Sequence, residues 1–349
     1  MTGIRIMVLL LALTSLSACQ PFSAPDSLLD EYVERLARVL EVDATRSEPA
    51  DAVRLPRRRD RVLAMPELDM NLLDFLSLYG CQLQYVVGEK NSIMGRVMQP
   101  LNRLRYEISF IHTAEDCLPT LDDDSLADSV TQAIKSKRKS LPIAVWNATW
   151  GVEETESLLT LAKGALPVEP NSAVLARSAA DLQSLDRVAG SLLSGDLSVS
   201  LDRVGEVHQR WLSNHSAGQL INSARLLVSR LHDATRLIHQ RLEQRPLCLD
   251  GKPSAQFSVV KSLFFNVYIG KVQAYLTRVR RSRDAIIAPL RRLAEQQQTV
   301  MPEAFRAFYR TDLAAHGAQS LWYQLEQATN AHTEAWQTLL AQCGQRPSA

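Results

Sequence analysis

The chain has 349 residues, of which 46% are hydrophobic and 22% are charged, and its formal net charge is +1. This composition excludes a largely disordered chain, and the balanced charge disfavours nucleic acid as a partner. Glycine is scarce, with 14 residues, whereas the abundant leucine, alanine, arginine and glutamine lose little freedom in a helix. We therefore expect a mainly α protein with one large or two small domains.

Residues 1–18 are typical of an export signal. Arg5 supplies a positive charge, and residues 6–13 form an apolar run too short for a bilayer, which takes about 20 residues. The sequence LSAC at 16–19 resembles the lipobox of bacterial lipoproteins, in which the cysteine sulfur receives the lipid. We expect cleavage before Cys19 and lipidation of that residue. The alternative is a plain secreted leader with a chance cysteine.

Residues 19–25 are expected to form a short lipidated tether. Gln20 follows the lipidated Cys19, and by the sorting rule of Gram-negative lipoproteins a residue other than aspartate there implies the outer membrane, facing the periplasm. One acyl chain holds a protein only marginally, whereas the three chains of this lipoprotein class imply stable anchoring. The sequence has no later apolar run of about 18 residues, so we expect no second membrane segment.

Apolar periodicity predicts an amphipathic helix at 26–42, capped by Asp26 or Ser27. The linker at 43–66 contains prolines and a basic run that could contact anionic lipid or another envelope polymer, or could be a solvated connector. Its arginines are Arg54, Arg57, Arg58, Arg59 and Arg61. Helices are predicted next at 68–79, 81–87 and 100–116, the last two forming a helical hairpin.

A polar cluster of Glu89, Lys90, Asn91 and Ser92 falls in the predicted turn between Gly88 and Gly95. A turn with an acid, a base, an amide and a hydroxyl could bind a small polar ligand or a partner protein. In the structural alternative, the asparagine and serine cap the next helix and the glycine supplies the turn.

The middle of the chain is less regular. Asp122–Asp124 could bind a cation, but negative charge at the start of a helix at 125–138 explains them better. Residues 143–150 are the best strand candidate, although their imperfect alternation equally indicates an apolar connector. A helix is predicted at 172–193.

The C-terminal half predicts three long helical paths of similar length, joined by short connections. They run over 200–244, over 254–299 with a kink at Pro289, and over 303–342 with a break near Gly317. Such paths predict an elongated antiparallel bundle with little or no β structure. We expect a helical lipoprotein domain at 26–343, divided into an N-terminal subdomain at 26–170 and a long-helix bundle at 171–343, before a flexible tail at 344–349.

Four cysteines, Cys81, Cys117, Cys248 and Cys343, remain after lipidation. In an oxidising compartment they suggest two disulfides with three possible pairings, or else four buried thiols. In the predicted bundle, Cys248 and Cys343 lie at the same end. Cys248–Cys343 is therefore the first choice, and Cys81–Cys117 follows by elimination across the smaller hairpin.

Residues 81–118 carry a resemblance to a known family. The block contains CQLQ at 81–84, EKNSIMGR at 89–96, LRYE at 104–107 and CL at 117–118. It resembles an uncharacterised family of Gram-negative lipoproteins, domain of unknown function 3080, over nearly the whole mature chain. The resemblance supports the lipoprotein assignment and the Cys81–Cys117 pairing, and it implies no particular activity.

The sequence contains no G-x-S-x-G, phosphate-binding loop, H-E-x-x-H or dinucleotide-binding pattern. The pairs His208–His215 and His232–His239 are each separated by two helical turns, about 10 Å, which is too far for one metal ion. We expect no catalytic residue, metal or cofactor. The leading hypothesis is a non-enzymatic outer-membrane lipoprotein that binds or scaffolds an envelope protein or a cell-wall component. The alternatives are a lipid- or small-molecule-binding lipoprotein and, third, an enzyme acting on the cell wall.

Overall fold

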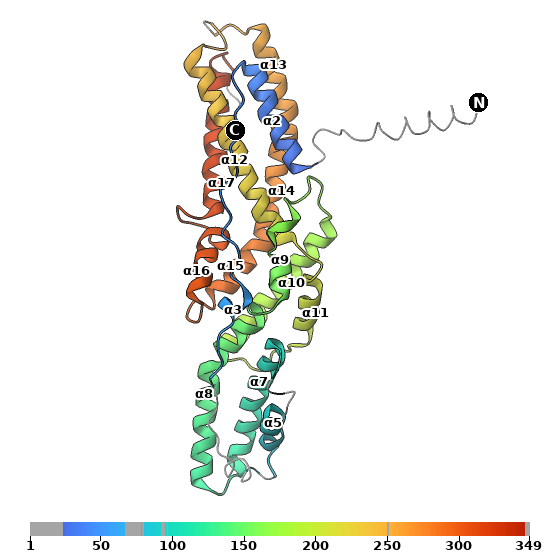
Figure 1. The fold of residues 1–349 in the computed structure, drawn as a ribbon, viewed down its shortest axis with the longest axis vertical. Helices are drawn as coiled ribbons and strands as arrows, with labels where there is room; N and C mark the ends of the chain where they lie inside the picture. Colours follow the sequence, from blue (N-terminus) through green and yellow to red (C-terminus); the bar gives the residue numbers. More distant parts are fainter. Residues whose placement is uncertain are drawn as a thin grey trace, which may run out of the picture.

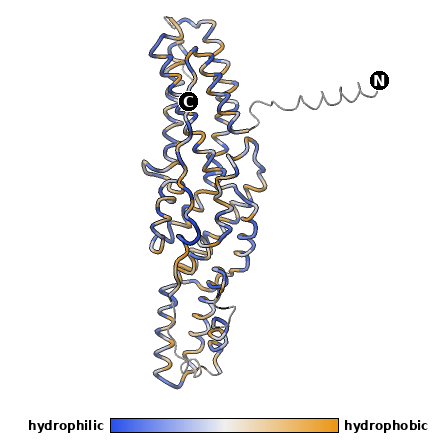
Figure 2. Tube along the Cα trace, in the orientation of Figure 1, coloured by the Kyte–Doolittle hydropathy of each residue, from blue (hydrophilic) through white to orange (hydrophobic). Residues whose placement is uncertain are grey.

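The computed structural model describes residues 24–66, 78, 80–91, 95, 97–249 and 251–345. The molecule is elongated and mainly helical (Figure 1), and the described residues contain no strand, only an isolated bridge between Leu249 and Lys252. Hydrophobic and hydrophilic residues alternate along the helices (Figure 2), as amphipathic packing requires. No helix among the described residues is long and apolar enough to cross a membrane.

The upper part of the molecule in Figure 1 is a bundle around α12. Three helices ascend toward the same end, and one long path descends between them. The ascending helices are α2 (Pro25–Leu40), α12 (Ser216–Gln244) and α17 (Leu321–Ala341). The descending path comprises α13 (Ala255–Leu263), η4 (Phe264–Gln273), α14 (Ala274–Ser282), η5 (Arg283–Ile287) and α15 (Ala288–Glu295). The predicted helical class and long-helix bundle are therefore confirmed.

The descending path is continuous but contains two π-helical segments, η4 and η5. Pro289 follows η5 directly, in the first turn of α15. A proline lacks the N–H that an α-helix needs and crowds the carbonyl four residues earlier, so a widened turn before it relieves both problems. The kink predicted at Pro289 is thus realised as a π-helical turn.

The helix predicted at 26–42 is α2, but it does not pack with the rest of the expected N-terminal subdomain. It lies against α12, α13 and η4. In the core of the bundle Tyr32 donates a hydrogen bond to His332 (2.7 Å) and accepts one from Trp336 (2.9 Å). Burial lowers the pKa of His332 to about 3, so the imidazole stays neutral and can accept the hydrogen bond from Tyr32.

The expected single helix at 200–244 is wrong, because two helices occupy this stretch. The first, α11 (Asp202–Trp211), ends before α12 begins at Ser216. The side chain of Asn214 accepts a hydrogen bond from the N–H of Ser216, the first residue of the new helix (3.0 Å). Gly218 then lets the backbone of Thr160 approach closely, since a Cβ at this glycine would lie 2.0 Å from the Thr160 oxygen. Along α12, residues spaced by three or four from Leu220 to Arg241 are buried, as the periodicity of an amphipathic helix requires.

Residues 143–150 form no strand, because they continue α8 (Asp124–Thr149) through Pro142. Nearly every side chain in this final part of α8 is buried, so the segment lacks the polar face by which a helix is recognised in sequence. Trp146 and Trp150 pack on Phe305, with ring centroids 5.0 and 4.8 Å from its ring. At the other end, Asp123 accepts bonds from two backbone N–H groups, which confirms the helix-start interpretation of the aspartates.

The lower end of the molecule in Figure 1 is a small helical unit. It consists of α5 (Gln82–Asn91), α7 (Pro100–Cys117) and the first half of α8. The helix predicted at 68–79 falls almost wholly outside the described residues. The Cys81–Cys117 disulfide joins the residue before α5 to the last residue of α7, with a Cα–Cα distance of 5.8 Å. At the top of the molecule, the Cys248–Cys343 disulfide joins the segments that follow α12 and α17, with a Cα–Cα distance of 5.2 Å. Both predicted pairings are confirmed.

Candidate functional site

The described part of the polar cluster singled out in the sequence is helical. Glu89 and Lys90 lie in the last turn of α5, which ends at Asn91. The prediction of a turn from Gly88 was wrong because packing of α5 on α7 outweighs the low helix propensity of glycine. The Asn91 side chain and Ser92 lie outside the described residues, as does Cys19.

Lys90 adds positive charge near a buried ion cluster in the same unit, where it helps to lower the pKa of Lys137. Glu107 of α7 is completely buried and accepts hydrogen bonds from Arg103 (2.6 Å) and Lys137 (3.0 Å). Burial is the main cause of the lowered Lys137 pKa, and Glu107 opposes it. The Lys137 ammonium also lies 4.9 Å from the centroid of the Tyr106 ring. These charges satisfy one another inside the helix packing, so we assign the cluster a structural role.

A different candidate lies at the middle of the molecule, where an extended strap of residues 42–57 crosses from the top of α2 to the short helix α3 (Arg58–Arg61). In Figure 1 the strap runs down the front of the bundle. It passes between α12 and a segment made of α16 (Glu303–Phe308) and the π-helical η6 (Tyr309–Leu313). Prolines and polar residues prevent the strap from forming a helix of its own.

The upper half of the strap is fixed to α12 by a buried carboxylate. Asp233 is fully buried and accepts hydrogen bonds from the Ser47 backbone N–H (3.0 Å) and hydroxyl (2.7 Å). Arg230 donates to the Ser47 carbonyl (2.6 Å) and also to Asp30 of α2 (2.6 Å). The position of the strap is therefore set by charged groups of α12.

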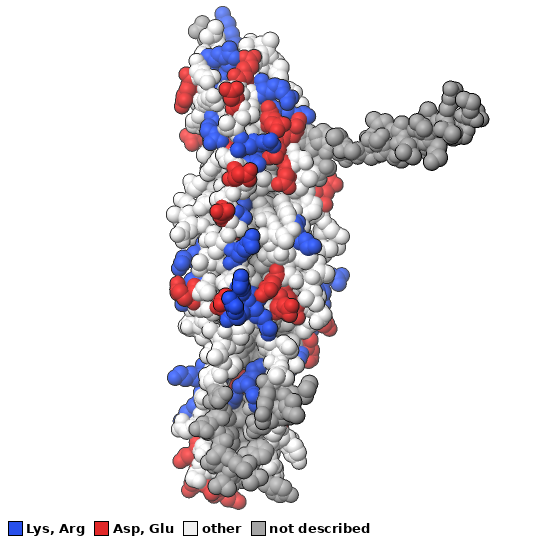
Figure 3. All heavy atoms as spheres, viewed as in Figure 1, with Lys and Arg blue, Asp and Glu red and all other residues white. Residues whose placement is uncertain are grey.

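The lower end of the strap is fixed by Arg61. This side chain is fully buried and donates to the backbone carbonyls of Pro56 (2.8 Å), Trp150 (2.7 Å) and Val152 (3.0 Å). It also makes two hydrogen bonds to one oxygen of Glu156, at 3.0 and 3.1 Å. Arg54, Arg57, Arg58 and Arg59 are exposed, whereas the burial of Arg61 shows that this arginine is not part of a solvated connector. In Figure 3 basic side chains gather in the region of α3.

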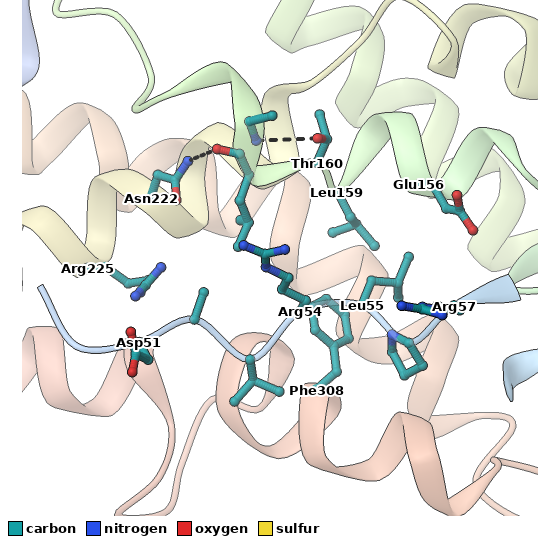
Figure 4. Close-up of a pocket in the computed structure, with 15 residues that line it drawn as sticks. Asp51, Arg54, Leu55, Arg57, Glu156, Leu159, Thr160, Asn222, Arg225 and Phe308 are labelled. Atoms are coloured by element: carbon teal, nitrogen blue, oxygen red, sulfur yellow. Dashed lines mark hydrogen bonds between the residues drawn. The ribbon is translucent and has the colours of Figure 1, made fainter.

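A cavity of about 800 Å³ lies beside the lower half of the strap. In Figure 4 the Arg54 side chain extends from the strap into this cavity, and Arg225 of α12 faces Asp51 of the strap. Asn222 donates to the Leu161 carbonyl (2.8 Å) and so holds the opposite wall in place. The polar residues that line the cavity are Asp51, Arg54, Arg57, Glu156, Thr160, Asn222 and Arg225, and the larger apolar ones are Leu55, Leu159, Leu161 and Phe308.

A second cavity, of about 710 Å³, lies beside the upper half of the strap. Its wall is formed by the strap, α12, η6 and the start of α17, and it includes His232, Arg310 and Asp312. Asp51, Ala52, Val53 and Arg225 line both cavities, so the two spaces meet at this point of the strap. Each volume lies in the usual range of small-molecule sites.

Asp312 is the most unusual group of the site. Its side chain is buried, and its Oδ2 atom has no hydrogen-bond partner among the described residues. Burial raises the pKa of Asp312 to about 7, and the charge of Arg225 opposes this shift only in part. Burial also lowers the pKa of Arg225. A ligand that supplied a hydrogen-bond donor to Asp312 would satisfy the buried oxygen.

The pKa of Asp312 predicts a pH effect on stability. An unfolded aspartate titrates near pH 4, so raising the pH from about 4 through about 7 deprotonates the unfolded state first. The contribution of Asp312 to folding is therefore full below about pH 4 and is lost as the pH rises through about 7. We expect Asp312→Asn, which stays neutral, to gain stability relative to the unaltered protein over this interval, in urea unfolding followed by circular dichroism.

The other titrating groups contribute equally to the stability of the Asp312→Asn variant and of the unaltered protein, so their contributions cancel when the two are compared. The Asp284→Asn variant, at an exposed position, controls for the loss of a charge. A difference between the Asp312→Asn variant and the unaltered protein that stayed constant from about pH 4 to about pH 8 would show that Asp312 is already ionised in the native state.

Apart from the basic run of the linker, no sequence pattern indicated this site. Asp312 and Arg225 stand on helices as ordinary polar residues, and the strap resembles any proline-containing linker. The histidine pairs that the sequence singled out do not meet. No group of three or more His, Cys, Asp or Glu side chains in the described part of the chain could hold a metal ion.

Comparison with known proteins gives a family but no activity. No curated protein and no solved structure matches the chain. Residues 29–347 match the family model described as "Protein of unknown function (DUF3080)", which covers the bundle from Leu29 of α2 onward and every residue of the strap. The chain therefore belongs to this family of unknown function.

Proposed function

We propose that this protein is an outer-membrane lipoprotein that faces the periplasm and binds an envelope ligand in the two cavities along the strap. The observation that carries the binding role is that the cavities meet at Arg225, beside a buried carboxyl with an unpartnered oxygen. Two spaces of this size at the centre of a helical bundle favour the ligand-binding alternative over a scaffold without a pocket.

The charges of the lower cavity indicate the class of ligand. Arg54 and Arg57 line it, and neither makes an ion pair with another described residue. Guanidinium groups bind carboxylates and phosphates through paired hydrogen bonds. Leu159 and Phe308 add apolar surface to the wall. We therefore propose an amphiphilic anion, with its anionic group at the arginines and its apolar part against these side chains.

The proposed lipid anchor is inferred from the sequence of the first twenty residues. The charged start, the apolar run and the LSAC sequence occur in the order that lipidation requires, and Gln20 favours sorting to the outer membrane. We expect Cys19→Ala to leave an uncleaved precursor, and mass spectrometry of the unaltered protein to find a lipidated N-terminal cysteine. A mature protein of normal size from the Cys19→Ala variant would contradict the proposed lipidation of Cys19. It would not bear on the proposed ligand site in the cavities.

The ligand is tested by native mass spectrometry of protein purified from the envelope. We expect one co-purified anionic molecule, and we expect Arg54→Ala/Arg57→Ala to reduce its occupancy about tenfold or more, because each arginine contact to an anion contributes about 1.5–3 kcal/mol. Arg59→Ala/Arg203→Ala removes two exposed arginines outside the cavities and is the matched control. Equal loss in both variants would mean general charge attraction rather than binding at this site.

The partner-binding alternative is favoured by a separate observation at the lower end of the molecule. Tyr85 on α5 is 72% exposed, and Val97 before α7 is 70% exposed. Large exposed apolar side chains of this kind are typical of protein contacts. Proximity cross-linking in cells tests this alternative. One dominant partner that is lost on Tyr85→Ser, but kept when Arg54 and Arg57 are replaced, would establish it.

A further inference from the structure

The outward face of α13 and η4 combines exposed apolar side chains with a long stretch free of acids. Val259, Phe265 and Ile269 are 54%, 52% and 36% exposed. Between them lie Ser262 and Asn266, which are joined by a hydrogen bond of 3.0 Å. We call these five residues the α13–η4 face. They recur at intervals of three or four residues and so form one stripe along the path.

The charged residues in this part of the sequence are all basic. From Gly251 to Arg283 the sequence has no aspartate or glutamate, but it has seven lysines and arginines. Lys252 precedes the stripe, Lys261 lies within its length, and Lys271 follows it by two residues. Two acidic residues of the neighbouring α2 are already paired, Glu31 with Arg35 and Asp30 with Arg230. A basic rim around apolar side chains is the pattern of a surface that binds anionic lipid.

The position of α2 brings this face close to the expected anchor. Asp26, at the start of α2, lies near Tyr275 of α14, since it contributes to the raised pKa of that hydroxyl. Ile269 precedes Tyr275 by six residues, about 9 Å along the helix axis. Six residues separate Cys19 from Pro25, so the lipid can lie at most about 20 Å from the start of α2. Figure 1 shows α2 beginning beside α14.

We propose that the α13–η4 face is a membrane-docking surface that lies on anionic lipid beside the anchor. Phe265 and Ile269 enter the boundary between headgroups and acyl chains, and Lys252 and Lys261 face the lipid phosphates. The long axis of the molecule then lies along the membrane instead of standing away from it. The position relative to the anchor rests on the proposed lipidation of Cys19, whereas the affinity of the face for lipid does not.

The test uses the mature chain with Cys19→Ser, so that no attached lipid contributes. Its sedimentation is measured with vesicles of phosphatidylcholine alone and of equal parts phosphatidylcholine and phosphatidylglycerol. We expect binding to the anionic vesicles that weakens with salt. We expect Phe265→Ser/Ile269→Ser to lower the partition coefficient about tenfold or more. We expect Lys252→Glu/Lys261→Glu to lower binding to the anionic vesicles to a similar extent.

The control variant, Val174→Ser/Leu212→Ser, removes two apolar side chains of similar exposure on α10 and beside α11. It should bind like the unaltered chain. Helicity and the thermal midpoint of each variant show that it is folded. The proposal is overturned if the anionic vesicles do not bind the chain, or if the control variant loses as much binding as Phe265→Ser/Ile269→Ser. The mass of the natural N-terminus tests the anchor separately, so failure of the surface and failure of lipidation are distinguishable.

Discussion

Replacing Arg61 with methionine should lower the free energy of unfolding by about 3–5 kcal/mol, because the change removes a buried charge that three backbone carbonyls and Glu156 depend on. Methionine keeps much of the side-chain volume but donates no hydrogen bond. The buried carbonyls of Trp150 and Val152 then lose a partner inside the protein, where water does not replace it freely.

Urea unfolding followed by circular dichroism measures this loss. The matched control is Arg59→Met, because Arg59 lies two residues away with a side chain that is 74% exposed, and it should change stability by less than about 0.5 kcal/mol. Limited proteolysis adds a local measurement, since we expect cleavage within residues 43–57 to become faster only in the Arg61 variant. A loss below about 1 kcal/mol would show that the strap is held mainly by Asp233.

Removing the Cys248–Cys343 disulfide should have the second large effect. This bond closes a loop of 95 residues, and the chain-entropy relation gives a stabilisation of about 4–5 kcal/mol. The Cys81–Cys117 bond closes only 36 residues, so its removal should cost about 1 kcal/mol less. Serine at each pair of positions, with urea unfolding under non-reducing conditions, compares the two directly. A larger loss from the shorter loop would mean that the disulfides act mainly on native packing rather than on the unfolded chain.

The sequence predicted the fold best where one face of a helix is buried and the other is exposed to solvent. The buried face of α12 follows simple helical periodicity, and the aspartates lie at the start of α8 as expected. The end of α8 was missed because its residues are buried on all sides, which removes the contrast that periodicity needs. The break at Asn214 was missed because one asparagine inside a periodic stretch is a weak signal.

The candidate site was harder to predict than the fold. The strap contacts α12 across about 180 residues of sequence, as in the bond from Arg230 to Ser47. Such a contact depends on the tertiary arrangement and leaves no local pattern. Asp312 and Arg225 become unusual only after burial changes their pKa values, which no spacing of residues reveals. Conversely, the cluster from Glu89 to Ser92 looked unusual in sequence, and its described part lies at the end of an ordinary helix.

The place of α2 has a consequence for the order in which the molecule assembles. This helix is synthesised first, yet its core partner Trp336 follows Tyr32 by 304 residues. Contacts of such long range close slowly, because much chain entropy is lost before they form. The lower unit, whose disulfide spans 36 residues, can fold while the chain is still growing. The apolar face of α2 therefore stays uncovered until α12, α13 and η4 have been made, and this exposed helix is where we expect a holding chaperone to bind.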